Sequence, residues 1–356
     1  MIAETANSKE IITGNMASEK APAARMNAAE TVAGKIAQAD VSIIIVTWNG
    51  KKYALECLDS LRALHSELAL EIIVVDNASS DGTPDAIAQQ YPEVKLFRNS
   101  DNLGFAKANN IGIAASCGDY VALVNSDVVV PPGCLEKMVA YMKASPEIGL
   151  LGPKMLGPTG EIGQSVNRIP TVWNYFCFAL GLHSLVPGSK LFGGYIMADY
   201  AYDKTEDVEV LTGWFWMVPR RALEQVGGLD ERFFMYGEDL DWSHRFLKAG
   251  WRVVFFAEAE ALHYGAASSG QAPTRFYVEM VRANLQYFEK HYGRLGGFGF
   301  RFATAVHEVV RMAAYGALYC FSPRRRKTAA LKVRRSLSCL QWLASGSRQS
   351  PQADGK

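Results

Sequence analysis

The sequence predicts an α/β fold: a doubly wound, mostly parallel central sheet with flanking helices, followed by a C-terminal helical extension. Three observations predict this fold. Runs of β-branched residues alternate with segments of helical periodicity, an order typical of parallel sheets with right-handed crossovers. Polar clusters follow directly after several of these runs, where such sheets bind their ligands. The residues from 293 onward are amphipathic and basic.

The expected elements follow one another in a regular order along the chain. Four short runs rich in Val, Ile and Leu are expected to be strands of the sheet: 41–46, 71–75, 94–97 and 120–124. The segments between them carry apolar residues at helical spacing and are expected to be helices: 51–64, 84–90 and 105–115. Further along we expect a helix over 240–249, a strand over 251–256 and a helix over 298–321.

Three regions of the chain differ in composition. Residues 1–39 are rich in Ala, Glu, Lys, Asn and Ser and are expected to form a mobile arm. Residues 40–292 contain the alternating pattern and are expected to fold as one α/β domain with halves at about 40–130 and 131–292. Residues 293–356 are expected to form a basic, amphipathic helical extension.

The formal net charge of +1 hides an uneven distribution of charge. Residues 294–356 hold twelve Lys or Arg and two acids, whereas residues 41–293 carry a net charge of −8. A basic tail suits an anionic partner, and the acidic body argues against nucleic acid. The six cysteines are scattered without metal-ligand or redox spacing, which fits a reducing, cytoplasmic compartment. We expect neither a secretory signal nor a membrane-spanning helix, since no apolar stretch has the required form.

Polar side chains stand after three of the four expected strands, at the edge where such sheets bind ligands. They are, in chain order, Thr47, Trp48 and Asn49, then Asp76 and Asn77, then Asn125. A carboxylate or amide there can accept a hydrogen bond from a pyrimidine ring or a ribose hydroxyl, and an indole can stack on the base. Turn chemistry alone would also explain the segment 76–82. The coincidence of three clusters at one edge favours a nucleotide site.

Gly104 and Lys107 open the expected helix over 105–115. The glycine permits a close approach of the backbone, and the lysine is a candidate to offset phosphate charge. The segment after the first strand is not a Gly-rich phosphate loop of the dinucleotide or triphosphate type. This counts against a dehydrogenase and against a P-loop kinase.

Asp127 is the candidate metal ligand, because it ends the polar cluster after the fourth strand. A departing diphosphate needs its negative charge neutralised, and Mg²⁺ or Mn²⁺ held by oxygen ligands does this. One carboxylate is a weak site, so His263, which follows the strand over 251–256, is a candidate to complete the shell or to contact the diphosphate. A purely structural role for this histidine stays open.

Glu238 and Asp239 stand at the start of the expected helix over 240–249. Acids in a first helical turn complement the helix dipole, which is the structural alternative. Three acids in four positions beside the aromatic run 233–236 exceed that need. A carboxylate against aromatic rings can have the raised pKa that a general base requires. We therefore expect Asp239 to be the catalytic base and Glu238 to orient the substrate.

An aromatic wall follows a small residue in the segment 211–216. We expect Gly213 and Trp214 of this segment, together with Trp242, to contact an acceptor. One carboxylate for a metal-diphosphate and another for deprotonating a hydroxyl are what a transfer of sugar from a nucleotide to an acceptor requires.

The segment 298–335 combines an apolar face with a basic cluster at 324–327. This combination is typical of a helix that lies in an anionic membrane interface, here the inner face of the plasma membrane. The alternative is a helix packed on the body of the protein with solvated arginines after it.

The chain resembles the family 2 glycosyltransferases of the GT-A fold, especially the bacterial rhamnosyltransferase-like branch. The matching segments are VSIIIVTWNG (41–50), EIIVVDNASSDGT (71–83), NLGFAKANNIGI (102–113), YVALVNSDVVV (120–130), LTGWFWMVPR (211–220) and GGLDERFFMYGEDLDW (227–242). The resemblance implies an inverting transferase with a sugar-nucleotide donor and a divalent metal, and it covers roughly 41–290.

By matching position, the resemblance makes Asp127 the last carboxylate of the metal-binding triplet and Asp239 the catalytic base. Asp76 and Asn77 would contact the nucleotide, which makes 40–130 the nucleotide half and 131–292 the acceptor half. The triplet reads Asn-Ser-Asp here, so the first acid of the family pattern is replaced by Asn125.

The expected function is transfer of a sugar, L-rhamnose from dTDP-rhamnose in the first place, to a hydroxyl of a cell-surface glycan or lipid-linked acceptor. Transfer from a UDP-hexose or a UDP-N-acetylhexosamine stays open, because a few pocket contacts decide donor choice. A catalytically silent sugar-nucleotide-binding or membrane scaffold protein is the alternative of another class, supported only by the missing acid of the triplet.

Overall fold

The computed structural model describes residues 39–182, 189, 192, 197, 200–265 and 273–345. The expected mobile arm, apart from Ala39, lies outside these residues. The expected helical extension is described as far as Ser345.

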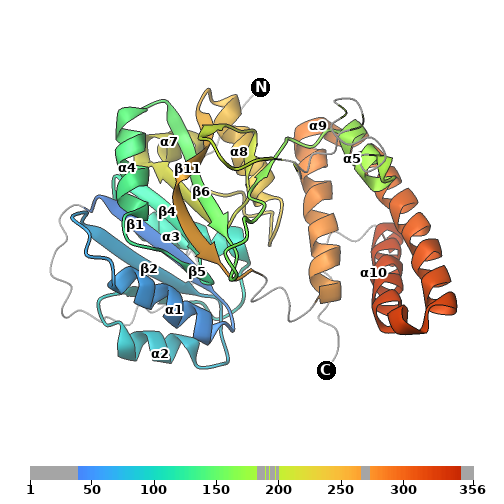
Figure 1. Cartoon of the computed structure of the whole chain (residues 1–356), viewed down its shortest axis with the longest axis horizontal. Coiled ribbons are helices and arrows are strands. Elements are labelled where there is room, and N and C mark those ends of the chain that lie inside the picture. Colours follow the sequence, from blue (N-terminus) through green and yellow to red (C-terminus); the bar gives the residue numbers. More distant parts are fainter. Residues whose placement is uncertain are drawn as a thin grey trace, which may run out of the picture. The chain divides into compact units, whose positions relative to one another are not determined.

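The centre of the described structure is a nine-stranded mixed sheet (Figure 1). Its strands follow the order β3-β2-β1-β4-β10-β6-β11-β5, and β8 pairs with β11. The strand bounds are β1 Val41–Thr47, β2 Leu70–Asp76, β3 Lys95–Arg98, β4 Tyr120–Asn125, β5 Val128–Val129, β6 Ile148–Leu156, β8 Glu206–Asp207, β10 Phe215–Pro219 and β11 Arg252–His263. A separate two-stranded sheet joins β7 Val166–Asn167 to β9 Val210–Leu211.

The first four strands of this order are parallel to one another, as the sequence predicts. β10 enters antiparallel between β4 and β6, and β11 returns parallel to β6. The sheet is therefore mostly parallel, with an inserted antiparallel strand. β1 is buried along almost its whole length, which explains why its sequence is a continuous apolar run and not an alternation.

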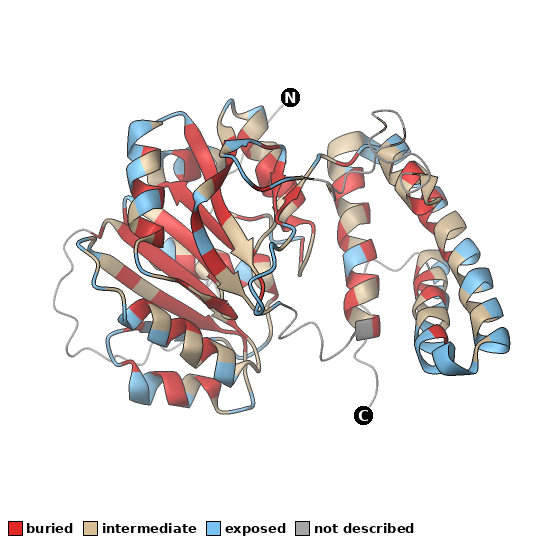
Figure 2. Cartoon of the chain, in the orientation of Figure 1, coloured by how far each residue is buried: buried red, intermediate tan, exposed pale blue. Residues whose placement is uncertain are grey.

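Helices cover both faces of the sheet, so the predicted doubly wound arrangement is confirmed (Figure 1). One core cluster joins the sheet to α1, α2 and α4, and a second cluster joins it to α3, α7 and α8. The helix bounds are α1 Lys51–Arg62, α2 Thr83–Gln90, α3 Phe105–Ala115, α4 Cys134–Ala144, α5 Val172–Ala179, α7 Arg220–Val226 and α8 Glu238–Lys248. Figure 2 shows the sheet as the most completely buried layer.

Two element boundaries differ from the prediction in ways that matter for the site. α8 begins at Glu238, so both candidate catalytic acids belong to its first turn. β11 continues through a register shift between Phe256 and Glu260 and ends at His263. Sequence periodicity ended this strand at 256 because the irregular stretch interrupts the apolar pattern.

The C-terminal region is a bent helix followed by a second helix. α9 runs over Pro273–Phe321, and α10 follows at Arg326–Ser345 after the short helix η2 at Pro323–Arg325. The helix expected over 298–321 is thus the second half of α9. Gly293 breaks the helix with φ 67° and ψ −164°, a conformation that only glycine adopts without strain.

The two halves of α9 pack against different partners. Residues of the first half, including Val281 and Phe288, share a core cluster with Phe233 and Leu240 of the α/β domain. The second half packs against α10 and against α5, where the rings of Phe300 and Tyr175 lie 4.5 Å apart. No helix in the described part of the chain is long and apolar enough to cross a membrane.

Candidate active site

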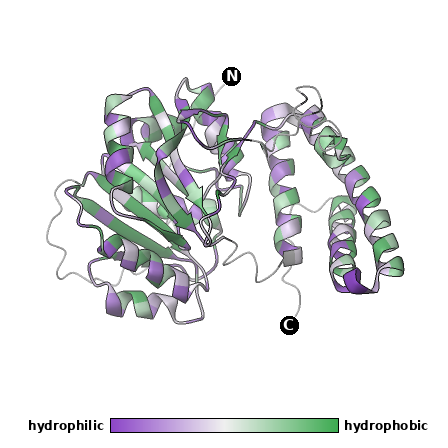
Figure 3. Cartoon of the chain, viewed as in Figure 1, coloured by the Kyte–Doolittle hydropathy of each residue, from purple (hydrophilic) through white to green (hydrophobic). Residues whose placement is uncertain are grey.

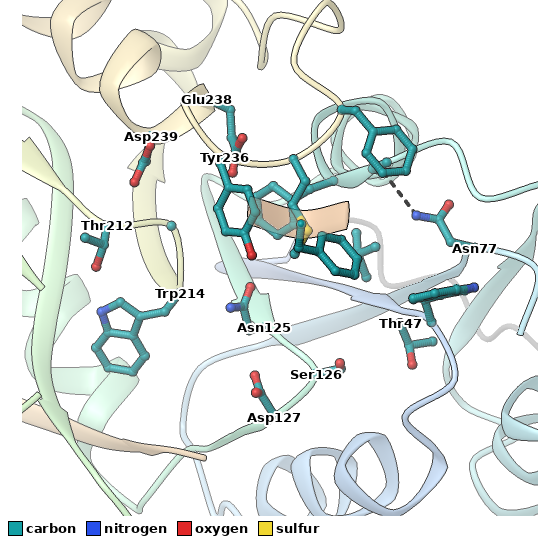
Figure 4. A pocket seen from close by; sticks show the side chains of 18 of the residues that line it. Thr47, Asn77, Asn125, Ser126, Asp127, Thr212, Trp214, Tyr236, Glu238 and Asp239 are labelled. Atoms are coloured by element: carbon teal, nitrogen blue, oxygen red, sulfur yellow. Dashed lines mark hydrogen bonds between the residues drawn. The ribbon is translucent and has the colours of Figure 1, made fainter. Parts of the chain in front are cut away.

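A cavity of about 490 Å³ opens where β1 and β4 end and α8 begins (Figure 4). Most of the residues that the sequence singled out line it: Thr47, Trp48, Asn77, Asn125, Asp127, Gly213, Trp214, Glu238, Asp239 and His263. They come from segments far apart in the chain. The meeting of parallel strand ends at one edge of the sheet is what brings them together.

The nucleotide side of the cavity is formed by the ends of β1 and β2. The Asn77 side chain is held in place, because its Nδ2 donates to the carbonyl of Gly104 at 3.1 Å and its Oδ1 accepts from Asn99 at 2.9 Å. Thr47 is almost fully buried, and its hydroxyl has no hydrogen-bond partner in the described part of the chain. A polar group in this state is poised to bond with a ligand.

Three candidate nucleotide residues do not line the cavity. Asp76 is buried behind the lining, where one carboxylate oxygen accepts from the backbone N–H of Ser79 at 2.9 Å. Asn49 adopts a left-handed backbone, and its Oδ1 accepts from the backbone N–H of Ser80 at 2.8 Å. Lys107 is exposed on α3. For Asp76, the hydrogen bond from Ser79 fits the turn chemistry that the sequence left open, and its second carboxylate oxygen has no hydrogen-bond partner among the described residues.

The wall formed by the ends of β4 and β11 contains Asp127 and His263. The imidazole Nε2 of His263 lies 3.1 Å from Oδ1 of Asp127, and its ring stacks on Trp214 with centroids 5.6 Å apart. The pairing of β11 with β5 brings these residues together, since His263 is opposite Val128. The end of a long strand thus supplies the histidine beside the carboxylate.

In the Asp127–His263 pair, a carboxylate oxygen and an imidazole nitrogen lie close together in one wall of the cavity, and both are possible metal ligands. In the described residues, no group of three His, Cys, Asp or Glu side chains could hold a metal ion. A divalent cation here would therefore have two side-chain ligands and would take its remaining ligands from water and substrate oxygens. Cations of this kind are commonly held that way beside phosphates.

Glu238 and Asp239, in the first turn of α8, line the cavity together with Asn125 and Tyr236 (Figure 4). Burial raises the pKa of Glu238 well above its usual range, and the negative charge of Asp239 raises it further. Burial also raises the pKa of Asp239, although the backbone N–H of Leu240, 2.8 Å from Oδ1, opposes this. A carboxyl group with a raised pKa can accept a proton from a hydroxyl more readily than an ordinary one.

Asp241, the third acid of this turn, points away from the cavity into an ion network. It is fully buried and contacts Lys290 at 2.5 Å, His291 at 2.7 Å and Arg245 at 2.8 Å. Burial alone would raise the pKa of Asp241. The hydrogen bonds from His291 and Lys290 outweigh this effect and hold the pKa at about 2. Of the three acids, Glu238 and Asp239 therefore face the cavity, and Asp241 fixes the helix to α9.

The structure corrects one acceptor prediction. Gly213 and Trp214 line the cavity, and a Cβ on Gly213 would come within 2.9 Å of Trp216, so a side chain is excluded there. Trp242 is fully buried in the core, where it packs on Trp216 and donates to the carbonyl of Gly227 at 3.0 Å. It faces the sheet and not the cavity, so it has no contact to offer an acceptor.

Several lining residues were not singled out from the sequence. They are Val46, Asn102, Phe105, Ser126, Met155, Gln164, Thr212, Phe234, Met235, Tyr236 and Phe276. The run that contains Phe234 and Tyr236 did stand out as aromatic, and the positive φ of 68° at Tyr236 turns the chain sharply before α8. Phe276 comes from α9, and no local pattern links that helix to the cavity.

Comparison with known proteins gives consistent results. A family model described as glycosyl transferase family 2 matches residues 42–227 of this chain. N-acetylglucosaminyl-diphospho-decaprenol L-rhamnosyltransferase of Mycobacterium tuberculosis is 33% identical over 246 residues, which cover 65% of this chain and 78% of that protein. The glycosyltransferase GlyG of Streptococcus pneumoniae is 30% identical over 254 residues, covering 70% of this chain and 78% of that protein.

A solved structure of similar extent is the mannosyltransferase PcManGT from Pyrobaculum calidifontis in complex with GDP-Man and Mn²⁺. It is 19% identical, with a TM-score of 0.49, and the alignment covers 86% of this chain and 88% of that one.

Proposed function

This chain belongs to glycosyl transferase family 2, and on that premise we propose that it is an inverting enzyme that moves a sugar from a nucleotide donor to an acceptor hydroxyl. The observation that carries the proposal is the shared cavity, because the candidate base Asp239 and the candidate metal ligand Asp127 line it together. Displacement at an anomeric carbon needs a base on the acceptor side and charge stabilisation on the leaving-group side.

In the proposed reaction, Asp239 takes the proton of the acceptor hydroxyl. The oxygen then forms a bond to the anomeric carbon from the face opposite the diphosphate, while the bond from that carbon to the phosphate oxygen breaks. The configuration at the anomeric carbon is thereby inverted, and a nucleoside diphosphate departs. The raised pKa of Glu238 favours its protonated form, which can donate a hydrogen bond that orients the substrate.

Asp127 and His263 fit a divalent cation, Mg²⁺ or Mn²⁺, because their ligand atoms converge beside the cavity. Such a cation would supply neutralising charge for the departing diphosphate. Asn125, in place of the first acid of the triplet, lines the cavity as well and is available to bond with the donor.

For the donor we propose dTDP-L-rhamnose, with a UDP-hexose or UDP-N-acetylhexosamine as the alternative. The rhamnosyltransferase relative supports the first choice. For the acceptor we propose a glycan or lipid-linked glycan intermediate, since the name of that relative specifies a diphospho-decaprenol-linked sugar. The catalytically silent alternative is disfavoured because Glu238 and Asp239 both line the cavity with raised pKa values.

Thermal unfolding with nucleotides tests the proposal directly. The panel is dTDP, UDP, GDP and CMP, each with and without Mg²⁺ or Mn²⁺. A ligand at about a hundredfold its dissociation constant should stabilise the protein by roughly 2.7 kcal/mol. A metal-dependent shift with dTDP or UDP supports the transferase and selects the donor class. Folded protein that responds to none of the four would exclude the donor site.

We also propose that the extension contacts an anionic membrane surface at the inner face of the plasma membrane. Residues 294–345 contain ten Lys or Arg but a single acid, Glu308, and that side chain is fully buried. The exposed charge of residues 294–345 is therefore only positive. Such a surface is attracted to anionic lipids at about 1 kcal/mol for each Lys or Arg near them.

Apolar side chains on the same extension supply the second element of a membrane contact. Leu295, Phe298, Phe302 and Val309 are all more than half exposed, and they recur at helical spacing along the second half of α9. Figure 3 shows this apolar helix beside the hydrophilic turn that holds 324–327. An amphipathic helix with a basic edge is the form that lies in a lipid interface.

A further inference from the structure

Arg275 stands beside the cavity in the first turn of α9. Its neighbour in sequence, Phe276, lines the cavity. Its guanidinium carbon lies 5.8 Å from the ring centroid of Phe234, which also lines the cavity. A guanidinium over an aromatic ring keeps its N–H edge available for a planar anion.

Arg275 has no carboxylate within ion-pair distance in the described part of the chain, unlike two other half-buried cations of α9. Arg282 is 2.7 Å from Glu279, and Lys290 bridges Asp230 and Asp241. Glu279 is one helical turn from Arg275 but is bonded to Arg282 instead. Arg275 therefore carries an uncompensated charge next to the cavity.

The lining of the cavity is acidic, so a nearby cation such as Arg275 would favour the binding of an anionic substrate. The lining includes the acidic residues Asp127, Glu238 and Asp239, of which Glu238 favours its protonated form, and the lining residues that the structure describes include neither Lys nor Arg. Under the proposed function, a diphosphate of two or more negative charges enters this site. A single divalent cation on the Asp127 side would not neutralise both the acidic lining and the diphosphate. Further positive charge near the cavity therefore favours binding of the diphosphate.

Resting on the proposed function, we propose that Arg275 binds the diphosphate group of a substrate at the cavity. Arg is suited to this because its fork of N–H groups matches two phosphate oxygens at once. Two sources share the chemistry: the nucleoside diphosphate of the donor and a lipid diphosphate on the acceptor.

Calorimetric titration of the full chain with Mg²⁺ separates the two sources. The probes are dTDP and UDP in one arm and farnesyl diphosphate in the other. Arg275→Gln is expected to weaken binding in at least one arm by roughly tenfold to a hundredfold, the range for a lost charge-assisted hydrogen bond. Arg275→Lys, which keeps the charge without the fork, should recover part of this loss.

Arg221→Gln is the matched control, since Arg221 also lies over an aromatic ring, at 5.6 Å from Trp251, but Trp251 does not line the cavity, whereas Phe234 does. A loss confined to the nucleotides assigns Arg275 to the donor, and one confined to farnesyl diphosphate assigns it to the acceptor. Equal affinities of Arg275→Gln and wild type in both arms would overturn the proposal while leaving the proposed function intact. A wild type that binds none of the probes would overturn both.

Discussion

Glu238 is buried beside a second carboxylate, and one of its oxygens has no hydrogen-bond partner in the described residues. Its folded-state pKa is raised above the unfolded value of about 4.3. The folded state then holds the proton more tightly than the unfolded state does. The free energy of unfolding therefore falls as pH rises from about 4.3 through the raised pKa.

From this we predict that Glu238→Gln stabilises the protein at neutral pH, by about 1–3 kcal/mol, because folding no longer requires this buried side chain either to take up a proton or to hold a charge. The advantage should shrink as pH falls and vanish below about pH 4, where wild-type Glu238 is protonated in both states. Chemical unfolding across this pH range measures the difference. Glu224→Gln, at an exposed position, is the control and should show no such trend. A constant difference at every pH would contradict the explanation.

Asp239 differs from its neighbour in its expected effect on rate. As the proposed base, Asp239→Asn should lower kcat by roughly a hundredfold to ten-thousandfold, the usual contribution of general base catalysis. Nucleotide affinity should stay close to that of wild type. Because burial raises the pKa of Asp239, the wild-type rate should decline on acidification at a higher pH than an ordinary aspartate would give. Steady-state kinetics with the preferred donor measures both effects, and an unchanged kcat in Asp239→Asn would rule out Asp239 as the base.

Sequence could predict which residues lie together where chemistry and strand position coincide. Thr47 ends β1, and Asn77 and Asp127 follow the ends of β2 and β4, so their meeting at one cavity follows from the fold, while their roles stay predictions. Trp242 was misassigned although a signal existed: Trp242 and Phe246 are one turn apart and form an apolar face of α8. Phe276 carried no signal at all, because its position depends on how α9 packs.

At the scale of elements, α8 is fixed to α9 through Asp241, and this contact helps to orient the first turn of α8, which holds Glu238 and Asp239. Asp241→Asn leaves the cations of Lys290 and Arg245 without their buried partner. We expect the free energy of unfolding to fall by on the order of 3 kcal/mol, as for other broken buried pairs. Thermal or chemical unfolding at neutral pH measures the loss.

Asp85→Asn serves as the comparison for this variant, because Asp85 pairs with Arg98 on the exposed surface. Exposed pairs contribute about 0–1 kcal/mol, so this variant should remain near wild type. If the two variants lost equal stability, the network around Asp241 would not be a structural anchor.

The elements that sequence could predict are those whose partners are near in the chain. β1 to β4 alternate with their helices, and each apolar run reports its own burial. β10 could not be placed in this way. It inserts antiparallel between β4 and β6, and a pairing over so long a separation is decided by packing and not by local pattern. The bend at Gly293 was also hidden, because helical periodicity continues on both sides of it.

For the whole molecule, the uneven charge that the sequence shows becomes a division of roles. The α/β domain carries the acidic cavity, and the exposed charge of residues 294–345 is entirely positive. An acidic site has no affinity of its own for an anionic surface, so any membrane contact of the described chain should depend on the extension. Lipid-linked acceptors are held at such a surface, which would place substrate and enzyme together.

We therefore predict that the full chain binds vesicles containing anionic lipid and binds neutral vesicles much more weakly. Replacing Arg324 and Arg325 together by Gln should weaken binding to anionic vesicles by about 2 kcal/mol, or roughly thirtyfold. Replacing Phe298 and Phe302 by Ser should weaken it further, because both rings are exposed on the apolar face of α9. Co-sedimentation with vesicles of each composition measures these affinities.

The matched control replaces Lys52 and Lys143, which are exposed on α1 and α4 of the α/β domain, by Gln. This pair removes the same charge from the molecule but not from the extension. If binding depends on net charge alone, both double variants will weaken it equally, and the extension is not the contact surface. If only the extension variants lose vesicle binding while nucleotide affinity is retained in all of them, membrane attachment and donor binding are separate properties of one chain.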